Sequence, residues 1–432
     1  MNHEQSRRSF IRSAAAGAIG AGAAAHLVSA TSWGASGRGT SARLKVGVIG
    51  CGGRGTGAVS DILSASPDVE LWAMGDAFID RVNSSRNNLA GLEESLASRC
   101  RVPDERCFAG FDAYQKVLAS GVDIVILATN PHFRPMHFEA AVAAGKHVFM
   151  EKPVAVDPAG VRKVIAAGEE AARKRLTVVA GTQRRHETSY LAAMAKVREG
   201  AIGRIVSANC AWNQGGLWVV KKEPAWSDTE WHLRNWLYFA WTSGDHIVEQ
   251  HVHNLDVCNW AIGATPLRCV ASGGRQVRTA PEYGHIYDHF AVQYEYPGGV
   301  TVHSYCRQQP GCKDRVAEQF LGTDGVLDTS PGFASIAGAN RWRFSERNNN
   351  PYVQEHRDLM SSVLGGQGLN EAKAVAEATL TAVMGRMAAY TGKEVTWEFA
   401  LNESKLDLTP PAYAFGPLPT PEVAMPGRTP LI

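Results

Sequence analysis

The chain has neither a large net charge nor a long hydrophobic segment in its body. Its 44 basic and 42 acidic residues nearly cancel, so the basic excess typical of nucleic-acid-binding proteins is missing. After the first 35 residues, no apolar run approaches the roughly 20 residues that a membrane-spanning helix needs. We therefore expect no nucleic-acid partner and no membrane span in the mature protein.

Paired cysteines and internal repeats are also missing. The eight cysteines include no C-x-x-C pair and follow no regular spacing, which favours reduced, mostly buried thiols over a disulfide framework. We find no repeated segment. The 432 residues suffice for two ordinary domains.

The first residues resemble an export signal. Arg7 and Arg8 stand in the sequence SRRSFIR, a twin-arginine signature, and an Ala/Gly-rich run follows. We predict a signal peptide at 1–35, a linker at 36–43, and export of the folded protein to a periplasmic or other extracytoplasmic location. The alternative is an unstructured start that contains a chance alanine run.

A glycine-rich turn follows the first expected strand. The segment LKVGVIGCGGRG begins at Leu44, and its apolar residues predict a buried strand. The turn reads G-x-G-x-x-G and precedes a helix-like stretch, so free N–H groups there can bind a pyrophosphate. A second strand, 69–74, leads to Asp76, an acid placed to bind a ribose 2′-hydroxyl and to favour NAD over NADP. The predicted cofactor residues of this region are Gly50, Gly52, Gly53, Arg54, Gly55 and Asp76.

Strands and helices alternate through the next hundred residues. We predict helices at 79–98, 112–120, 135–144 and 157–175, and strands at 122–128, 146–150 and 176–181. This alternation is typical of an α/β fold with a doubly wound parallel sheet, here a Rossmann domain at 44–185. Ligands of such sheets lie beyond the carboxyl ends of the strands. The residues there add Thr129, Asn130, His132, Glu151, Lys152 and Gln183 to the cofactor site, and Arg184, Arg185 and His186 as substrate contacts.

The pattern changes after residue 186. Strand-like runs at 204–213, 267–276, 287–296, 299–307 and 314–322 predict an open, mostly antiparallel sheet in a second α/β domain at 186–400. Helices are expected at 246–262, 351–364 and 370–390. The Pro-rich segment 401–432 is either an arm that lies on a partner subunit or a frayed terminus.

Lys152 stands in the tripeptide Glu-Lys-Pro, directly after an expected strand. Pro153 biases Lys152 towards an extended conformation, which directs its side chain out of the carboxyl edge of the sheet. A partly desolvated lysine beside a cationic nicotinamide can have a pKa low enough for proton transfer. The alternative is an ordinary surface lysine.

A second candidate for proton transfer lies in the stretch 244–256. On one helix, Glu249 and His253 would share a face, with Asp256 one turn further along. A carboxylate beside an imidazole orients the ring and stabilises its protonated form. Two alternatives stay open: a structural polar helix, and a metal site built from His246, Glu249 and His253. We predict no metal, because no second cluster has ligand spacing.

Six tryptophans fall within residues 212–241. Indole rings stack on the C–H faces of sugars, but they also fill cores and subunit interfaces. We expect core or interface roles for most of them, with Asn213 and Trp236 among the substrate contacts. The six are Trp212, Trp218, Trp226, Trp231, Trp236 and Trp241.

The nucleotide turn, the Glu-Lys-Pro tripeptide and the acid-x-x-x-His segment, in this order, resemble the glucose–fructose oxidoreductase/inositol dehydrogenase (Gfo/Idh/MocA) family. The resemblance implies a Rossmann domain, an open-sheet domain that forms a homodimer or homotetramer, and nicotinamide-dependent chemistry at a carbinol carbon of a sugar or cyclitol. By position, Lys152 and His253 match the catalytic lysine and histidine, and Thr129 and His137 match cofactor-lining residues. Asp256 matches the acid after the histidine, and we count it among the predicted substrate contacts.

Two positions depart from the family pattern: Glu249 replaces the usual aspartate, and His251 stands where glycine is common. We expect an oxidoreductase that holds NAD(H) tightly and acts on a carbohydrate, polyol or glycoside hydroxyl, because no free NAD pool is expected outside the inner membrane. One alternative is a redox-neutral glycoside hydrolase or lyase. The other is a non-catalytic sugar-binding protein.

Overall fold

A computed structural model describes residues 43–432. The predicted signal peptide and most of the predicted linker lie outside the described residues. No helix among residues 43–432 is long and apolar enough to cross a membrane. All eight cysteines lie in this range, and none of them forms a disulfide there.

The first sheet has six parallel strands in the order β3-β2-β1-β4-β5-β6. This order confirms the predicted Rossmann topology. The three-residue strand β3 was not predicted, since it is too short to show a pattern. The strands are β1 (Leu44–Ile49), β2 (Val69–Asp76), β3 (Cys107–Ala109), β4 (Ile124–Leu127), β5 (His147–Met150) and β6 (Val178–Ala180).

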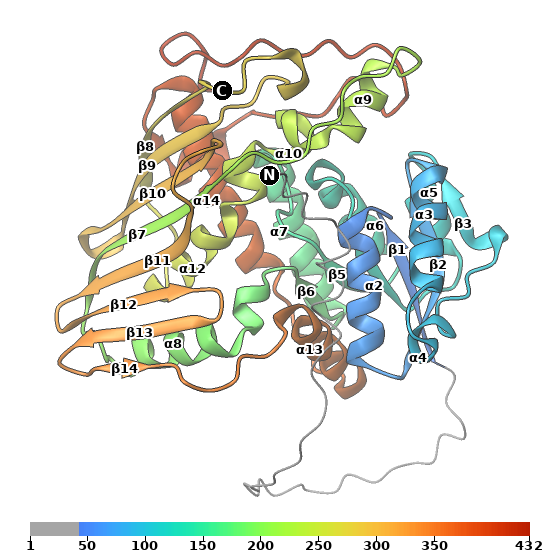
Figure 1. The fold of residues 1–432 in the computed structure, drawn as a ribbon, viewed down its shortest axis with the longest axis horizontal. Coiled ribbons are helices and arrows are strands. Elements are labelled where there is room, and N and C mark those ends of the chain that lie inside the picture. The colour runs from blue at the N-terminus through green and yellow to red at the C-terminus, as the bar shows by residue number, and fades with distance from the viewer. Residues whose placement is uncertain (1–42) are drawn as a thin grey trace, which may run out of the picture. The chain divides into compact units, whose positions relative to one another are not determined.

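Helices cover both faces of this sheet (Figure 1). The helix expected at 79–98 is divided, because the chain turns at Gly91 before a short second helix begins. The helices are α2 (Gly53–Ala65), α3 (Ile79–Ala90), α4 (Glu94–Ala97), α5 (Ala113–Ala119), α6 (Arg134–Ala143) and α7 (Pro158–Arg173).

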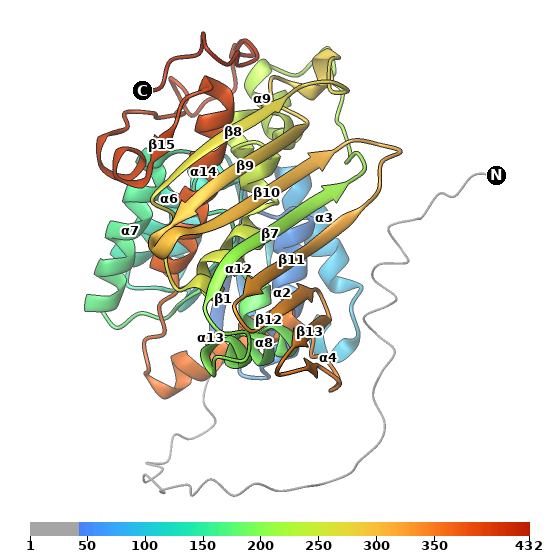
Figure 2. The same ribbon diagram turned by 90° about the vertical axis from the view of Figure 1, so that its left-hand side faces the viewer.

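The second sheet has nine strands in the order β14-β13-β12-β11-β7-β10-β9-β8-β15. Its neighbours pair antiparallel except β10 and β7, which are parallel. The strands are β7 (Ile205–Gln214), β8 (Arg268–Gly274), β9 (His289–Tyr296), β10 (Val300–Gln308), β11 (Arg315–Gly322), β12 (Gly325–Ser330), β13 (Phe333–Gly338), β14 (Trp342–Arg343) and β15 (Val395–Thr396). Figure 2 shows one face of this sheet without a covering helix, so the expected open, mostly antiparallel sheet is confirmed.

The remaining helices belong to the second half of the chain. α13 packs on α2 and α14 packs on α7, so both join the second half of the chain to the Rossmann helices. They are α8 (Thr188–Arg198), α9 (Asp228–Arg234), α10 (Ala240–Ser243), α11 (His246–Glu249), α12 (Val252–Ile262), α13 (Pro351–Gly365) and α14 (Ala372–Thr391).

The insert between β7 and α11 forms an aromatic cluster with the Rossmann domain. Trp231 and Trp241 are buried there together with Phe78 and Phe133, which follow β2 and β4. Trp218 is 41% exposed. Trp226 and Trp236 are half-buried against the same cluster and Trp212 against the main core, so five of the six tryptophans take part in core packing.

The Pro-rich C-terminal segment packs on its own chain. Leu408 and Leu418 pack against the aromatic cluster, and the Ser404 hydroxyl donates to the carbonyl of Ile432. The segment is thus a loop closed at its base, and Figure 1 shows it crossing the top of the view towards α9. Neither a frayed end nor a partner subunit is needed to explain its order.

Candidate active site

The glycine turn after β1 is built so that only glycine fits. Gly50 has a φ of +101°, and a Cβ there would lie 2.4 Å from the backbone of Ala128. A Cβ on Gly55 would lie 1.8 Å from the carbonyl oxygen of Gly50. These contacts let α2 begin directly against the ends of β1 and β4, as a dinucleotide site requires.

The start of α2 is open to an anion. No side chain caps its N-cap residue, Gly52, and no acidic residue stands in its first turn. A Cβ on Gly53 would meet no atom within 4 Å. The first N–H groups of the helix are therefore available to phosphate oxygens, and the turn fits the pyrophosphate of NAD.

Asp76 is fixed against this turn. Its carboxylate accepts the N–H of Cys51 at 2.7 Å and the N–H of Phe78 at 3.0 Å. Burial raises the pKa of Asp76, and the two hydrogen bonds partly oppose that change. Because each carboxylate oxygen can accept more than one hydrogen bond, acceptor capacity is left for a ribose hydroxyl.

Arg54 and Glu151 lie beside the turn and contact each other. The Arg54 Nε lies 3.0 Å from Glu151 Oε1, and the guanidinium also bonds to Asp61. The guanidinium therefore points along α2 towards β5, away from the helix start. The pair joins the phosphate-binding helix to the strand that delivers Lys152.

Lys152 reaches across to the second domain. Its Nζ donates to the carbonyl of Glu249 at 2.8 Å and lies 3.5 Å from Glu249 Oε1. Both side chains are largely buried, at 13% and 14% exposure. The other Glu249 carboxylate oxygen is buried and has no hydrogen-bond partner among residues 43–432.

The prediction of a single helix at 246–262 is wrong. The chain forms α11, breaks at Gln250 and His251, and continues as α12. Glu249 and His253 therefore do not share one helical face. The Glu249 carboxylate contacts Lys152, and no hydrogen bond among the described residues joins it to His253.

The His253 ring lies on an aromatic surface. Its centroid is 5.7 Å from that of Trp212, and the two planes differ by 24°. Burial and the nearby positive charges of Lys152 and Arg184 lower the pKa of His253 well below its usual value. The imidazole is therefore neutral at pH 7 and able to accept a proton.

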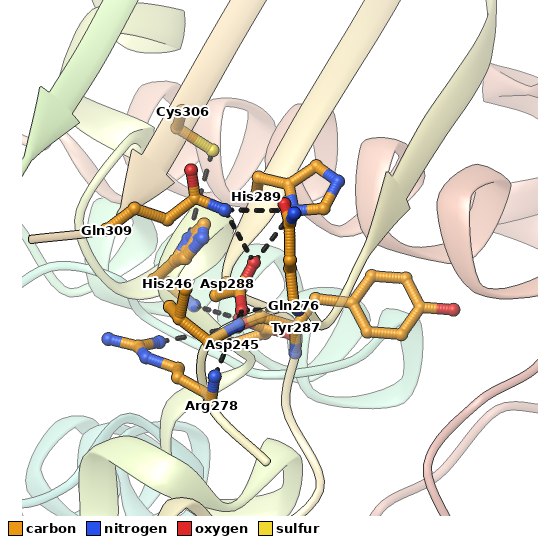
Figure 3. Close-up of polar contacts among 10 residues, drawn as sticks. Asp245, His246, Gln276, Arg278, Tyr287, Asp288, His289, Cys306 and Gln309 are labelled. Carbon is orange, nitrogen blue, oxygen red and sulfur yellow. Dashed lines mark hydrogen bonds and ion pairs between the residues drawn. The ribbon is translucent and has the colours of Figure 1, made fainter. Parts of the chain in front are cut away.

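The turn before α11 is held by Asp245 (Figure 3). Asp245 has a φ of +71°, which is rare for a residue other than glycine. Its carboxylate accepts the N–H groups of His246 and Tyr287, and the hydroxyl of Tyr390. Burial raises the pKa of Asp245 to about 6, although these hydrogen bonds oppose the change. The strained turn fixes where α11 begins, and with it the position of Glu249.

The other predicted cofactor residues lie at the same edge of the Rossmann sheet. The Thr129 hydroxyl lies 3.3 Å from His137 Nδ1, and burial lowers the pKa of His137 to about 3. His132 is buried and contacts Tyr413. Asn130 and Gln183 are half-buried.

Comparison with known proteins assigns a family to this arrangement. Residues 44–180 match the description "Oxidoreductase family, NAD-binding Rossmann fold", and residues 190–328 match "GFO/IDH/MocA C-terminal domain". The chain belongs to the Gfo/Idh/MocA oxidoreductase family. Its first domain is therefore an NAD-binding Rossmann domain, in agreement with the geometry of the glycine turn.

Individual members of the Gfo/Idh/MocA family are moderately similar to the chain. An inositol 2-dehydrogenase of Acidothermus cellulolyticus is 26% identical over 311 residues, which span 70% of this chain and 78% of that enzyme. A 2,7-anhydro-N-acetylneuraminate hydratase of Escherichia coli is 29% identical over 181 residues, or 41% of this chain and 44% of that enzyme. The crystal structure of an aldose-aldose oxidoreductase from Caulobacter crescentus, in complex with glycerol, shares the fold. Its TM-score is 0.64 at 17% identity, covering 82% of this chain and 99% of the other.

Four residues predicted to contact substrate, Arg184, Arg185, His186 and Asp256, form ion pairs within the chain. Arg184 is 2% exposed and bonds to the buried Glu318. Arg185 binds both oxygens of Asp256, at distances from 2.8 to 3.1 Å. These pairs lie beneath α12 and fix its orientation, which leaves the two arginines and Asp256 little freedom to bind a ligand.

His186 is the third of these residues. Its Nδ1 lies 2.6 Å from Asp358, and its Nε2 lies 3.4 Å from Glu371. Burial alone would lower its pKa, but the two carboxylates outweigh burial and raise the pKa to about 10. His186 is therefore a buried cation that ties the end of the Rossmann sheet to α13.

Asn213 and Trp236, the other predicted substrate contacts, are half-buried on β7 and in the insert. Trp236 pairs with Trp218 at a centroid distance of 6.3 Å. Sequence reasoning counted Trp212 among the tryptophans but did not place it at the site. Its contact with His253 depends on the register of β7 against α12, which no local pattern reveals.

The alternative of a metal at His246, Glu249 and His253 has no geometric support in the described chain. The His246 ring packs edge-on against Phe290, and its Nδ1 lies 3.9 Å from the Cys306 sulfur. The break after α11 separates it from His253. Residues 43–432 contain no group of three or more His, Cys, Asp or Glu side chains arranged to hold an ion.

Proposed function

We propose that this chain oxidises or reduces a CH–OH carbon of a carbohydrate, polyol or glycoside, with NAD(H) as the cofactor. The observation that carries the proposal is the contact of Lys152, from the Rossmann domain, with Glu249, from the second domain, close enough to His253 for the lysine charge to lower the pKa of that ring. The name of the inositol 2-dehydrogenase relative supports a polyol or sugar as the substrate class.

The roles of the two basic side chains follow from their charges. Neutral His253 accepts the hydroxyl proton of the substrate in the direction of oxidation. The Lys152 ammonium donates a hydrogen bond to the same oxygen and stabilises the negative charge that develops there. NAD bound at the glycine turn supplies the acceptor for the hydride that leaves the reacting carbon.

Glu249 acts on this pair through Lys152. Its carbonyl and carboxylate hold the ammonium in place, and its unpartnered oxygen is available to a substrate hydroxyl. This arrangement replaces the expected direct contact with His253. The longer glutamate side chain is consistent with that change.

Substitution of the two basic residues tests the proposal. General acid–base groups typically contribute 10²- to 10⁴-fold to turnover, so Lys152→Ala and His253→Ala should each lower turnover at least about a hundredfold. Lys146→Ala and His303→Ala, at positions outside the site, serve as matched controls. If both site variants stay within about tenfold of wild type, roughly 1.4 kcal/mol of barrier, the assigned roles are wrong.

A redox-neutral reaction is the second candidate. One relative is named a hydratase, and a cycle that returns the hydride would consume no NAD. Oxidation beside a carbon acidifies its C–H bond and permits elimination of a glycosidic oxygen. Cleavage of an aryl glycoside without added NAD would favour this candidate, whereas stoichiometric NADH formation would exclude it.

The proposed location is outside the inner membrane, and the support is the twin-arginine sequence at Arg7 and Arg8. In such a compartment the enzyme must keep its cofactor and regenerate it within the cycle. Purification of the exported protein followed by nucleotide analysis tests retention. Protein that is nucleotide-free and exchanges NAD rapidly would contradict it.

The proposed assembly is a homodimer or homotetramer formed through the open face of the second sheet. Val206, Val270 and Tyr305 are exposed at 38%, 47% and 46%, and no helix covers this face in Figure 2. Sedimentation analysis should therefore show a dimer or tetramer. A monomer at micromolar concentration would refute this assembly.

A further inference from the structure

The tip of the C-terminal loop lies against residues that follow strands of the Rossmann sheet. The Phe415 ring is stacked on Phe78 at 5.5 Å and lies 5.0 Å from Phe111. The Tyr413 ring lies 5.6 Å from Phe133, and its hydroxyl is 3.0 Å from His132 Nε2. Two aromatic side chains of this loop thus reach residues that follow three different Rossmann strands.

These contacts lie where the adenosine half of NAD is expected. Phe78 is two residues beyond Asp76 and donates its N–H to that carboxylate. His132 follows Thr129 and Asn130 after β4. Phe111, which follows β3, lies 6.4 Å from the Tyr413 ring and 5.0 Å from the Phe415 ring, so both side chains pack on one aromatic cluster beyond the carboxyl ends of the strands.

The base of the loop is fixed, whereas its tip is exposed. The carbonyl of Ala424 accepts the Tyr287 hydroxyl, and the N–H of Gly427 donates to Thr391. Residues 411–415 are all exposed, with Tyr413 at 37% and Phe415 at 46%. The tip is therefore held by its aromatic contacts and by the hydrogen bonds that the neighbouring Gly416 accepts.

The insert supplies a second wall at the same place. Arg234 of α9 forms an ion pair with Asp80 at 3.0 Å, and its guanidinium lies 3.9 Å from the ring of Phe78. Thr229 donates twice to the carbonyl of Gly416. The loop tip is thus held by the insert of the second domain as well as by the Rossmann domain.

We infer that Tyr413 and Phe415 form an outer wall over the adenosine end of NAD, and that the loop 404–432 sets how slowly the cofactor leaves. The inference rests on the proposed function, because it assumes that NAD binds at the glycine turn. It assigns retention to particular side chains that lie far from the reacting carbon. The loop opens to release the nucleotide and closes over it during catalysis.

The test is the release rate of NADH from the full-length protein, measured from the fluorescence of the bound nucleotide during a chase with excess NAD. The variant Tyr413→Ala/Phe415→Ala should release NADH at least tenfold faster than wild type. Tyr413→Phe keeps the ring and loses only the contact with His132, so its rate should be intermediate. Val423→Ala, in the same loop but away from the tip, should release NADH at the wild-type rate.

Two results would overturn the inference: an unchanged release rate in the double variant, or tighter NADH binding than in wild type. The second result would show that the tip occupies the adenosine position itself. Failure of the proposed function looks different, since the wild-type chain would then neither contain nor bind NADH. Thermal unfolding of each variant confirms that the exposed substitutions leave the fold intact.

Discussion

Replacing His186 with glutamine is expected to remove a stabilising contribution that depends on pH. The imidazole is 4% exposed and bonded to Asp358, with Glu371 nearby. Its pKa is about 10 in the folded chain and about 6.5 in an unfolded chain. The charged ring therefore favours folding over a wide range of pH.

The size and sign of the effect follow from this difference. A separation of roughly 3.5 pKa units at 1.36 kcal/mol per unit gives on the order of 5 kcal/mol as an upper value. Because Asp358 is 38% exposed, solvent screening reduces this to about 3–4 kcal/mol. The folded-state pKa is raised, so the contribution is complete below pH 6.5 and is lost as pH rises towards 10.

The measurement is urea unfolding of wild type and His186→Gln at several pH values from 6 to 10. The stability difference between the two should be about 3–4 kcal/mol at pH 6 and close to zero at pH 10. His303→Gln, which replaces a histidine without an ion pair among the described residues, should show a difference that changes little with pH. A difference for His186→Gln that stays constant across this range would refute the assigned ion pairs.

Three further substitutions test other parts of the account. Arg184→Met should destabilise the protein by about 3–5 kcal/mol in urea unfolding, because it leaves Glu318 charged, buried and unpaired. Adding Glu318→Gln should restore part of this stability. A loss under about 1 kcal/mol for Arg184→Met would contradict a structural role of the ion pair. Asp76→Ser should weaken NAD binding about tenfold or more, since a hydrogen bond to a charged group is lost. In a fluorescence titration, its affinity for NADP relative to NAD should rise. An unchanged cofactor preference would contradict the ribose contact. Gly55→Ala should abolish NAD binding in calorimetry, because the new Cβ would meet the Gly50 carbonyl at 1.8 Å, and retained affinity would show that the turn can shift at little cost.

The Rossmann half could be predicted because its signals are local. The spacing of Gly50 and Gly55 indicates a turn that other residues cannot form. The strand before Asp76 follows in the sequence at the distance that the Rossmann fold requires. Lys152 was found for the same reason, since it directly follows a buried strand. In each case a few consecutive residues are sufficient to predict the local structure.

The second half depended on contacts between distant segments. The start of α11 is set by the turn at Asp245, which Tyr287 and Tyr390 hold from other elements, and the helix ends four residues later, at Glu249. Helical spacing alone therefore placed Glu249 beside His253, although its carboxylate contacts Lys152. The pairing of Arg184 with Glu318 likewise joins residues 134 positions apart, which no periodicity in a single sequence reveals.

The C-terminal loop was beyond sequence reasoning for a related reason. A Pro-rich segment without periodicity gives no hydrophobic face to assign. Its position is decided by two aromatic side chains, Tyr413 and Phe415, and by backbone groups that bond to distant residues. Only the folded chain shows that this segment lies at the cofactor edge.

The central claim is that an NAD bound at the glycine turn shares its site with Lys152 and His253 and reacts with a CH–OH carbon. The most direct measurement is the absorbance of reduced nicotinamide in the purified, NAD-loaded protein during titration with a panel of sugars, polyols and glycosides. We predict that at least one compound reduces the bound cofactor in the wild-type protein. In His253→Ala the same reduction should be at least about a hundredfold slower. Tight binding of a sugar with no change at the nicotinamide, across the whole panel, would contradict it.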